Sequence, residues 1–574
     1  LLAAALQGAK EIGFTVVSMS LSLVAVFIPL LFMGGVMGTF FIEFAATLTM
    51  AILASMVVSL TLTPSLCGQF LRAQNGTGAN SPGRVVRGAE RAFDATLGAY
   101  RHGLQWALRH RWLMLGLTLA ALGVTLWLYT VVPKGFFPLQ DTGQMRGTIM
   151  AAPGTSFDAM SQKIRQATTL ILDDPAVQSV SAFTGGSSWH SGTNRGSLYV
   201  TLKPHAQRQA GVQQVINRLR PKFRQIVGTS TYLRPVQDFH SGGRSSSASF
   251  LYALSGEDLD QLYSWAPKLV DALQASPMFT DVSSDLDKAA PQVDVVIDRD
   301  AASRLGIPIA SIDAALNNSF SQRQVATIFD ALDTYRIVLE VAPGFKLSPA
   351  DFDRIHVKTR SGEAVPLSTV AHIKYGLAPL RVSHDGGFPV VNISYSLAPG
   401  VALGQATKAI QQTMLNIHMP GDIHGGGAGR MHLFSQSMSQ QPILILAALI
   451  TIYIVLGMLY ESLIHPITIL STLPSAGLGA LLALILFKSE LDVVSIIGII
   501  LLMGIVQKNA ILMIDFALDA KRKRGLEPAE AIYEACLVRF RPIVMTSLAA
   551  MLGALQLAIG FGTGSELRVP LGIA

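Results

Sequence analysis

The stretch from Val493 to Leu518 reads VVSIIGIILLMGIVQKNAILMIDFAL, and it is long enough to cross a lipid bilayer as one helix, for which about 20 mostly apolar residues suffice. Lys508 lies near its middle, roughly 15 Å from Leu518 at a rise of about 1.5 Å per residue. A lysine at that depth costs at least ~2.5 kcal/mol on insertion scales. We therefore expect Lys508 to face the interior of a helix bundle and to pair with a carboxylate.

The composition of the whole chain agrees with a membrane protein. Half of the 574 residues are apolar and 14% are charged, with a mean hydropathy of +0.43, whereas soluble domains have about 25% charged residues. The two cysteines, Cys67 and Cys536, provide no disulfide framework and lie in no metal-binding pattern. Six further uncharged runs predict membrane spans, at Gly13–Met33, Phe44–Leu71, Trp112–Val132, Pro442–Tyr460, Ser462–Phe487 and Pro542–Gly560.

Few carboxylates in the sequence are placed to pair with Lys508. Asp515 lies two turns further on the same helix face, but near the end of the span, where a solvated anchor is the simpler interpretation. No other Asp or Glu falls inside a predicted span. We expect the partner of Lys508 to lie outside this sequence, and the sequence to be the C-terminal half of a longer protein.

Basic residues gather in two segments that flank the spans. The segment Arg72 to Arg111 has seven arginines against Glu90 and Asp94, and the run Lys521 to Arg524 follows the sixth span. Because positively charged short loops stay in the cytoplasm, both segments should be cytoplasmic, which places the long region between the third and fourth spans on the opposite side. Membrane-flanking anchors explain these charges and the net charge of +7 better than nucleic-acid binding, which we do not expect.

The region between the third and fourth spans has an ordinary soluble composition. Its first part predicts strands and helices in the order β-α-β-β-α-β of the ferredoxin-like split unit, at Gln144–Met150, Ser156–Leu172, Ala176–Phe183, Ser197–Leu202, Gly211–Ile226 and Thr229–Val236. A second unit is predicted at Ser249–Leu254, Leu259–Gln274, Thr280–Ser284, Pro389–Leu397, Leu403–Asn416 and a strand near Arg430–Phe434. Between its two halves lies an insertion, Pro291–Leu380, with strands at Gln292–Ile297 and Tyr335–Val341.

A Gly/Ser-rich loop, TGGSSWHSGTNRG at Thr184 to Gly196, joins two strands of the first unit and is longer than a hairpin needs. Long loops of this kind are often functional. It is either a movable gate over a binding cleft, with aromatic surface from Phe183 and Trp189, or a disordered surface loop. The candidate pocket residues here are Phe183, Thr184, Gly185, Gly186 and Trp189.

The last span begins at Arg539, Phe540, Arg541 and Pro542, and Thr546 follows Arg539 by two helical turns on one face. A cation at the mouth of a span and a hydroxyl deeper in it fit a proton or ion path. The alternative is a pair of headgroup-binding arginines and a threonine that bonds within its own helix. The sequence contains no GxxxxGK[ST], GxSxG or HExxH motif, so we expect a secondary transporter driven by an ion gradient, without enzymatic activity and without a cofactor.

Six segments carry a resemblance to one family, and they are FIPLLFMGG at Phe27–Gly35, LTLTPSLC at Leu60–Cys67, VPKGFFPLQDTG at Val132–Gly143, LYESLIHPITILSTLPSAG at Leu459–Gly477, GIVQKNAILMIDFA at Gly504–Ala517 and RFRPIVMTSLAA at Arg539–Ala550. At these residues the chain resembles the resistance-nodulation-division (RND) permeases, in particular multidrug efflux pumps of the hydrophobe/amphiphile type. The resemblance covers essentially the whole chain.

The resemblance implies an α-helical polytopic membrane protein with seven complete transmembrane helices and a large α+β periplasmic porter region of ferredoxin-like subdomains. It implies two transmembrane helices in residues 1–71, a cytoplasmic basic linker in 72–111 and a helix in 112–132. A first porter subdomain would occupy 133–244, and a second 245–290 and 381–440, around a docking or funnel subdomain in 291–380. Residues 441–574 would hold four helices and the start of a truncated one.

The resemblance also implies a function. The chain would belong to a drug:proton antiporter of the bacterial inner membrane, with a proton relay of Lys508, Arg539 and Thr546 and an aspartate pair on the preceding helix. Its partners would be a periplasmic membrane-fusion adaptor, an outer-membrane channel, further permease subunits in a homo- or hetero-trimer, and amphiphilic small molecules. The alternatives are another RND-type exporter of lipids, metals or proteins, and a membrane-anchored periplasmic scaffold.

Overall fold

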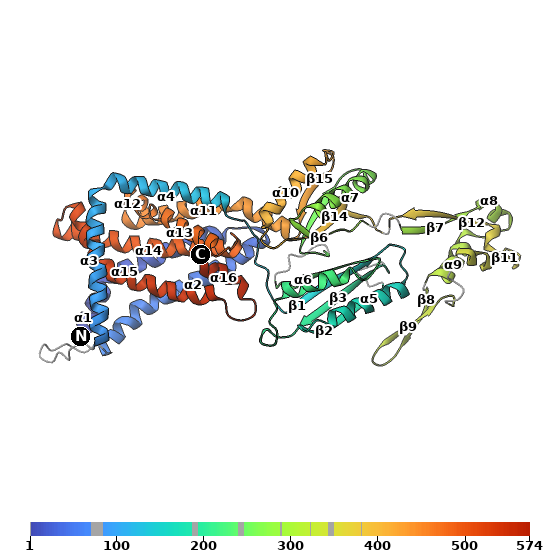
Figure 1. The fold of residues 1–574 in the computed structure, drawn as a ribbon, viewed down its shortest axis with the longest axis horizontal. Helices are drawn as coiled ribbons and strands as arrows, with labels where there is room; N and C mark the ends of the chain where they lie inside the picture. The colour runs from blue at the N-terminus through green and yellow to red at the C-terminus, as the bar shows by residue number, and fades with distance from the viewer. Residues whose placement is uncertain are drawn as a thin grey trace.

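The structure is a computed structural model, and it describes residues 2–70, 84–185, 193–238, 246–286, 290–321, 323–342, 349–379 and 381–574. Figure 1 shows an elongated molecule with three parts along its long axis: a bundle of long helices, two α/β units side by side, and a small strand-rich part at the far end. The chain leaves the bundle for the α/β units and returns to it, so the bundle contains both the first and the last elements.

Seven helical stretches among the described residues are long and apolar enough to span a membrane, as predicted. They are α1 (Leu2–Leu31), α2 (Gly35–Phe70), α4 (Arg111–Val131), α11 (Arg430–Tyr460), α12 with α13 (Ile464–Leu470 and Leu473–Leu486), α14 (Val493–Arg524) and α15 (Pro528–Ile559). A short helix, α16 (Val569–Ile573), follows them. The break between α12 and α13 falls just before Pro474, which lies in the first turn of α13. Proline is tolerated there because N–H groups in the first turn of a helix have no acceptor within the helix.

One predicted strand is wrong. Arg430–Phe434 forms the first turns of α11, and the strand that closes the second unit precedes it, as β15 (His424–Ala428). Three consecutive glycines in β15 concealed this strand, because glycine is depleted in strands and gives no alternation of side chains. Gly429 then turns the chain into the helix with a φ of 56°, a left-handed conformation that favours glycine.

The first α/β unit has all six predicted elements, each within a few residues of its predicted ends. They are β1 (Gln144–Ala151), α5 (Phe157–Leu172), β2 (Val177–Thr184), β3 (Arg195–Leu202), α6 (Val212–Phe223) and β4 (Thr229–Pro235). The strands form one antiparallel sheet in the order β2-β3-β1-β4. Alternate residues of β3 are buried, and Ile149, Leu198 and Leu219 lie in a hydrophobic core that belongs to this unit alone.

The second α/β unit is assembled from two separate stretches of chain. It contains β5 (Phe250–Ser255), α7 (Leu259–Ala275), β6 (Phe279–Ser284), β13 (Ser383–Asp385), β14 (Phe388–Leu397), α10 (Leu403–Asn416) and β15. The sheet order is β13-β14-β5-β15, with β6 also paired to β14. Leu254, Ile393 and Tyr395 belong to the same hydrophobic cluster as Phe27 and Leu456 of the bundle, so this unit is packed directly onto the membrane helices.

The inserted part is joined to the second unit by a two-stranded stalk of β7 (Ala290–Ile297) and β12 (Ala371–Ala378). It holds α8 (Arg299–Arg304), α9 (Ile309–Phe320), a hairpin of β8 (Arg323–Phe329) and β9 (Thr334–Leu339), η3 (Pro349–Arg354), the pair β10 (His356–Lys358) and β11 (Ala364–Pro366), and η4 (Leu367–Thr369). A small core that includes Ile312 and Leu367 stabilises it. The hairpin lies outside this core and projects from it.

Where the sequence suggested a basic linker, the structure has a helix, α3 (Arg84–Arg109), which lies across the ends of the other bundle helices (Figure 1). The ring of Phe540 on α15 stacks on Tyr100 of α3, with centroids 4.5 Å apart. Arg101 of α3 donates a hydrogen bond of 3.0 Å to the Tyr533 hydroxyl near the start of α15. The basic residues of α3 and the run Lys521 to Arg524 therefore lie at one end of the bundle, and the α/β units lie at the other.

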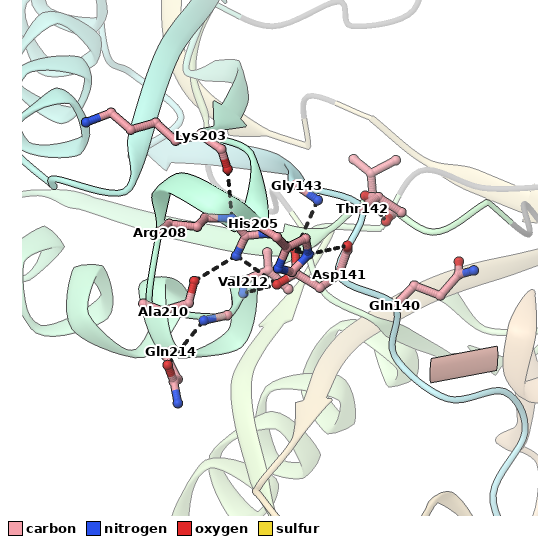
Figure 2. A network of polar contacts seen from close by, with 12 residues as sticks. Gln140, Asp141, Thr142, Gly143, Lys203, His205, Arg208, Ala210, Val212 and Gln214 are labelled. Atoms are coloured by element: carbon pink, nitrogen blue, oxygen red, sulfur yellow. Dashed lines mark hydrogen bonds and ion pairs between the residues drawn. The ribbon is translucent and has the colours of Figure 1, made fainter. Parts of the chain in front are cut away.

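A buried ion pair fixes the connection from α4 to β1. The Arg208 guanidinium donates two hydrogen bonds to Asp141, of 2.6 and 2.8 Å, and the two side chains are 1% and 9% exposed. The backbone N–H groups of Val212 and Gly143 donate to the same carboxylate, at 2.8 and 3.1 Å. Figure 2 shows these bonds converging on Asp141, with the His205 ring beside the guanidinium. The connection is thereby tied to the start of α6 in the first α/β unit.

Burial alone would raise the pKa of Asp141, but the hydrogen bonds from Arg208, Val212 and Gly143 and the guanidinium charge outweigh it and lower that pKa. A carboxyl group with a lowered pKa contributes stability that is present above its ordinary pKa and is lost as the pH falls through the lowered value. The ion pair therefore remains formed in moderately acidic solution.

We predict that Asp141→Asn destabilises the protein by ~3–5 kcal/mol, because it leaves the Arg208 guanidinium buried without a counter-charge. Thermal unfolding of the purified protein in detergent measures the change. As a control, Asp519→Asn breaks an exposed pair with Lys523 and should cost less than about 0.5 kcal/mol. Equal melting temperatures for the two variants would contradict a stabilising role of the Asp141 pair.

Candidate functional site

Lys508 lies in the middle of α14, at a half-buried position of the bundle. Among the described residues, Lys508 forms no ion pair. The prediction that this lysine pairs with a carboxylate outside the sequence remains a prediction. A charge at this depth without a carboxylate partner makes Lys508 the first candidate for a functional residue in the bundle.

Arg539 and Arg541 lie close together in α15 but contact different elements. The guanidinium of Arg539 lies 5.2 Å from the ring centroid of Phe516 on α14, and its Nε is buried without a hydrogen-bond partner. The guanidinium of Arg541 lies 5.6 Å from the ring of Phe93 on α3, at the end of the bundle. Arg539 thus faces the helix that carries Lys508, whereas Arg541 contacts the crossing helix. The two arginines therefore have different surroundings, and headgroup binding by either of them stays an alternative.

Thr546 lies on the exposed face of α15, and its hydroxyl donates to the Ile543 carbonyl at 3.1 Å. Its neighbour Ser547 accepts a hydrogen bond of 3.5 Å from Asn509, the residue after Lys508. This contact places Lys508 and Thr546 at the same depth in the bundle, on two helices that pack together. The structure therefore brings the three predicted relay residues to one pair of helices, α14 and α15, without a direct contact among them.

Asp515 is not only a solvated anchor. It is half-buried, and it accepts a hydrogen bond from the hydroxyl of Thr15 on α1. The two helices also approach closely further along, because a Cβ at Gly504 of α14 would collide with Leu23 of α1. Spacing along the sequence could not reveal this partner of Asp515, which is distant in the chain.

The predicted gate loop is described only in part. Gly186 and Trp189 lie outside the described residues. Phe183 is 62% exposed at the end of β2, with its ring edge-on to Tyr199 at 5.9 Å. Thr184 donates to the Arg195 carbonyl across the two strands, and Gly185 has a φ of 96° beside the Phe157 ring. The described part of the loop therefore presents an aromatic side chain to solvent.

A cavity of about 450 Å³ lies where the α/β units meet the ends of the membrane helices. Its apolar wall includes the aromatic rings of Phe136, Phe137 and Phe250, and its acidic wall includes Glu490, Asp492 and Glu566. Arg220 also lines the cavity, and the Arg430 guanidinium already lies over the rings of Phe136 and Phe250, at 6.0 and 5.6 Å, so the walls suit a ligand with both apolar and polar groups. The sequence gave no signal for this cavity, because its walls come from elements far apart in the chain.

Glu490 and Asp492 of the acidic wall lie where the connection before α14 is hydrogen-bonded to the connection after α4. The backbone of Leu491 donates to the Pro133 carbonyl at 2.8 Å and accepts from Gly135 at 3.1 Å. A Cβ at Gly135 would overlap the Glu490 carboxylate, so a larger residue here would require the Glu490 side chain to move. Asp492 caps α14 by accepting a hydrogen bond of 2.7 Å from the Ser495 N–H. The connection after α4 is therefore joined to the start of α14.

Burial raises the pKa of Glu490 to about 7, with a further contribution from the Asp492 charge. Burial also raises the pKa of Asp492 to about 6, against the lowering effect of its bonds to Ser495. Both carboxyl groups lie outside the membrane-spanning helices, next to the cavity. They can therefore change charge near neutral pH.

Sequence reasoning missed several buried polar groups in the bundle, among them Gln507 on α14, Ser18 and Ser22 on α1, and Tyr460 at the end of α11. All four are buried. Their residue types are common in membrane helices, and only the three-dimensional packing shows that they are buried together. In the described part of the chain no group of His, Cys, Asp and Glu side chains is arranged to hold a metal ion.

Seven apolar helices and two α/β units packed onto one end of their bundle define a multi-pass membrane protein. A model of the AcrB/AcrD/AcrF family matches residues 2–574 of this chain. The chain therefore belongs to this family of RND permeases, which are transporters and not enzymes. The resemblance predicted from the six sequence segments is confirmed.

Individual relatives agree with this assignment. The chain is 47% identical over 572 residues to a protein named multidrug resistance protein MdtC from Salmonella enteritidis PT4 (strain P125109). The aligned region covers 100% of this chain and 55% of the relative. The chain is 48% identical, with the same coverage, to the protein of that name from Klebsiella pneumoniae (strain 342). The six segments also suggest a likeness to MdtB/MdtC-type subunits, and these matches agree with it. The chain spans about half the length of the curated relatives it matches.

We predict that Glu490→Gln removes a pH dependence of stability. With a pKa raised from 4.5 to about 7, Glu490 contributes stability that is complete below 4.5 and is lost as the pH rises through 7. The variant should therefore melt at least about 2 °C higher than the wild type at pH 8, with no difference near pH 4.5. Glu257→Gln, at an exposed position, is the control, and its melting temperature should equal that of the wild type at both pH values. A pH-independent difference would rule out titration of Glu490 as the cause.

Proposed function

We propose that the chain is part of a proton-driven permease that exports amphiphilic or toxic compounds from the inner membrane as one component of a tripartite efflux system. The observation that carries this proposal is Lys508, a lysine deep in an apolar helix without a carboxylate partner among the described residues. The family membership and the printed name of the relatives support drug export as the activity.

The driving force in this proposal is the proton gradient, without a cofactor. Moving one elementary charge across the membrane supplies about 2.3 kcal/mol per 100 mV. Protonation of an aspartate pair on the preceding helix would release Lys508, and the helices would then shift between two arrangements. Arg539 supports this role, because its guanidinium faces α14 and its Nε has no protein partner. Thr546 lies at the depth of Lys508 and completes the proposed relay.

The α/β units would form the porter region. The element order and the β2-β3-β1-β4 sheet of the first unit support a ferredoxin-like subdomain. This unit has a core of its own, whereas the second unit shares a core with the bundle. A relative movement of the two units could therefore open and close the cavity between them and the membrane helices. The mixed apolar and charged walls of that cavity support amphiphilic compounds as substrates.

The arrangement across the membrane follows from charge. Both basic segments lie at the end of the bundle where α3 crosses it, and the positive-inside rule assigns that end to the cytoplasm. The α/β units would then lie in the periplasm, where an adaptor and an outer-membrane channel could meet them.

The β8–β9 hairpin supports a contact with another protein. Its side chains Phe329 and Leu332 are 80% and 99% exposed, and Ile328 and Tyr335 are exposed beside them. Exposed apolar groups on a projecting hairpin are typical of binding surfaces. A neighbouring permease subunit in a homo- or hetero-trimer, or an adaptor, would cover this surface. Metal export has less support, because no cluster of metal-binding side chains exists among the described residues.

We predict that Lys508→Met in the full-length permease abolishes drug resistance while the protein is still expressed and inserted. The variant removes the charge that would alternate between partners but keeps an apolar side chain of similar length. Drug susceptibility of cells and membrane-fraction immunoblots measure the two effects. Lys521→Met, a matched change at the basic end of α14, should leave resistance unchanged. Full resistance in the Lys508 variant would exclude it from the relay.

We predict that Phe183→Ala and Trp189→Ala change the set of exported drugs and do not abolish export. Phe183 is largely exposed, so its truncation should cost less than about 0.5 kcal/mol of stability. Resistance to a panel of large and small amphiphiles measures the change for each compound. A uniform loss for every compound, with a lowered melting temperature, would instead indicate a structural role.

A further inference from the structure

Two cavities follow one another along the interface between the two α/β units. The first is the cavity of about 450 Å³ at the ends of the membrane helices, which we call the inner cavity. The second has a volume of about 380 Å³, and we call it the outer cavity. Its lining residues come from α6 and β4 of the first unit and from α7 and β6 of the second, with the residues next to them. The outer cavity therefore continues the interface beyond the inner one.

Arg220 of the first unit and Asp281 of the second line both cavities. Along α6, Ile216 lines the inner cavity and Phe223 lines the outer one, and Arg220 lies between these two residues. Along β4, the last residues line the inner cavity and the first residues line the outer one. Arg220 and Asp281 therefore lie at the boundary between the two cavities.

These two residues form an ion pair that joins the units. The Arg220 guanidinium donates two hydrogen bonds to the Asp281 carboxylate, of 2.9 Å from Nε and 2.7 Å from Nη2. Its Nη1 donates to Oδ1 of Asn217 on the same helix at 3.0 Å, which orients the guanidinium. Arg218, two residues earlier on α6, pairs instead with Asp174 of its own unit at 2.8 Å. Two parallel hydrogen bonds make the Arg220 pair both directional and strong for its size.

The backbone of β6 directs the Asp281 carboxylate toward the other unit. Asp281 has a φ of 54°, a left-handed conformation that is uncommon outside glycine and is adopted most readily by Asp and Asn. The pairing of β6 with β14 shifts at the same point, between Ser394 and Ser396, so β6 has one extra residue there. Bulges of this kind redirect a side chain out of the regular strand pattern. The irregular backbone thus serves a contact between the units.

The exposure of the pair allows it to open and close. The Arg220 side chain is 29% exposed and that of Asp281 is 9% exposed, whereas Arg208 in the pair with Asp141 is 1% exposed. A guanidinium that water already reaches can exchange its carboxylate partner for water at a lower cost than a fully buried one. The two units also have separate hydrophobic cores, so their separation exposes no core that both share.

We propose that the Arg220–Asp281 ion pair is a latch between the two α/β units, which separates the inner from the outer cavity when closed and joins them into one groove when open. The structure shows the closed form. A ligand that extends from one cavity into the other requires the open form, so the latch limits the size of ligand that the closed form accepts. The inference goes beyond the proposed export function and does not depend on it, because the latch can be tested without a proton gradient.

The distance between the units tests the latch in the full-length permease. Spin labels at Gln166→Cys on α5 and Asp271→Cys on α7, both exposed positions, report this distance by pulsed electron paramagnetic resonance. The other cysteines are replaced, and unlabelled protein is present in excess. The wild type should show a major distance for the closed form and a minor one for the open form. Asp281→Asn tolerates the same backbone and should raise the open-to-closed ratio about tenfold, which corresponds to ~1.4 kcal/mol.

Further variants separate the latch from a general loss of stability. Arg220→Gln should raise the ratio as much as Asp281→Asn, and the two changes together should add no more, because both break one interaction. Arg220→Lys keeps the charge but loses the bidentate geometry, so its ratio should fall between those of the wild type and Arg220→Gln. Arg218→Gln is the matched control on the same helix, and it should leave the distances unchanged, since its pair lies within the first unit.

Ionic strength gives a second measurement. Raising the salt concentration from about 0.05 to about 1 M screens a partly exposed pair, so it should increase the open share in the wild type but not in Asp281→Asn. Unchanged distances in both Asp281→Asn and Arg220→Gln would overturn the latch, and so would equal responses of wild type and Asp281→Asn to salt. Drug resistance in Lys508→Met tests the proposed function separately, and its outcome leaves the latch unaffected.

Discussion

The free-energy cost of placing a polar group in hydrocarbon determines the secondary structure of the membrane part and the direction of its charged side chains. Backbone groups in a bilayer must be satisfied within the protein, which permits only helices here, and charged side chains must face the inside of the bundle. The few polar side chains that the spans retain are therefore informative. Lys508, Arg539 and Asp515 all lie on α14 or α15, and the orphaned amide of Gln507 lies on α14 as well. The candidate functional residues of the membrane part therefore lie on two helices.

The same reasoning shows what the sequence could predict. Uncharged runs predict spans because length and hydrophobicity are local properties, and all seven were found within a few residues or as parts of longer helices. The first α/β unit was predicted well because its strands alternate clearly. Arg430–Phe434 was predicted wrongly because the glycines of β15 carry no side-chain pattern, whereas the polar first turns of α11 resemble a strand end. Prediction from side-chain periodicity fails in a strand that consists mostly of glycine.

The candidate site was predictable only in part, and for a different reason. Depth along a span is a local property, so Lys508 could be identified from its position in one helix. Contacts between helices are not local. The bond of Thr15 to Asp515 joins residues 500 positions apart in the chain. The cavity likewise has walls from both α/β units and from the ends of the membrane helices. Neither pattern nor spacing can reveal such sites.

The position of α14 suggests how events in the membrane would reach the α/β units. Its middle carries Lys508 and Gln507, and the residue before its cap, Leu491, is hydrogen-bonded to Pro133 and Gly135. From there the chain runs directly to Asp141, whose carboxylate is held by Arg208 and by the start of α6 in the first unit. The links between separate segments are backbone hydrogen bonds and a buried ion pair. A shift of α14 along its axis would therefore pull on the first unit, while the second unit stays with the bundle through their shared core. The cavity lies between the two units and the bundle, so its shape would change with the charge on Lys508.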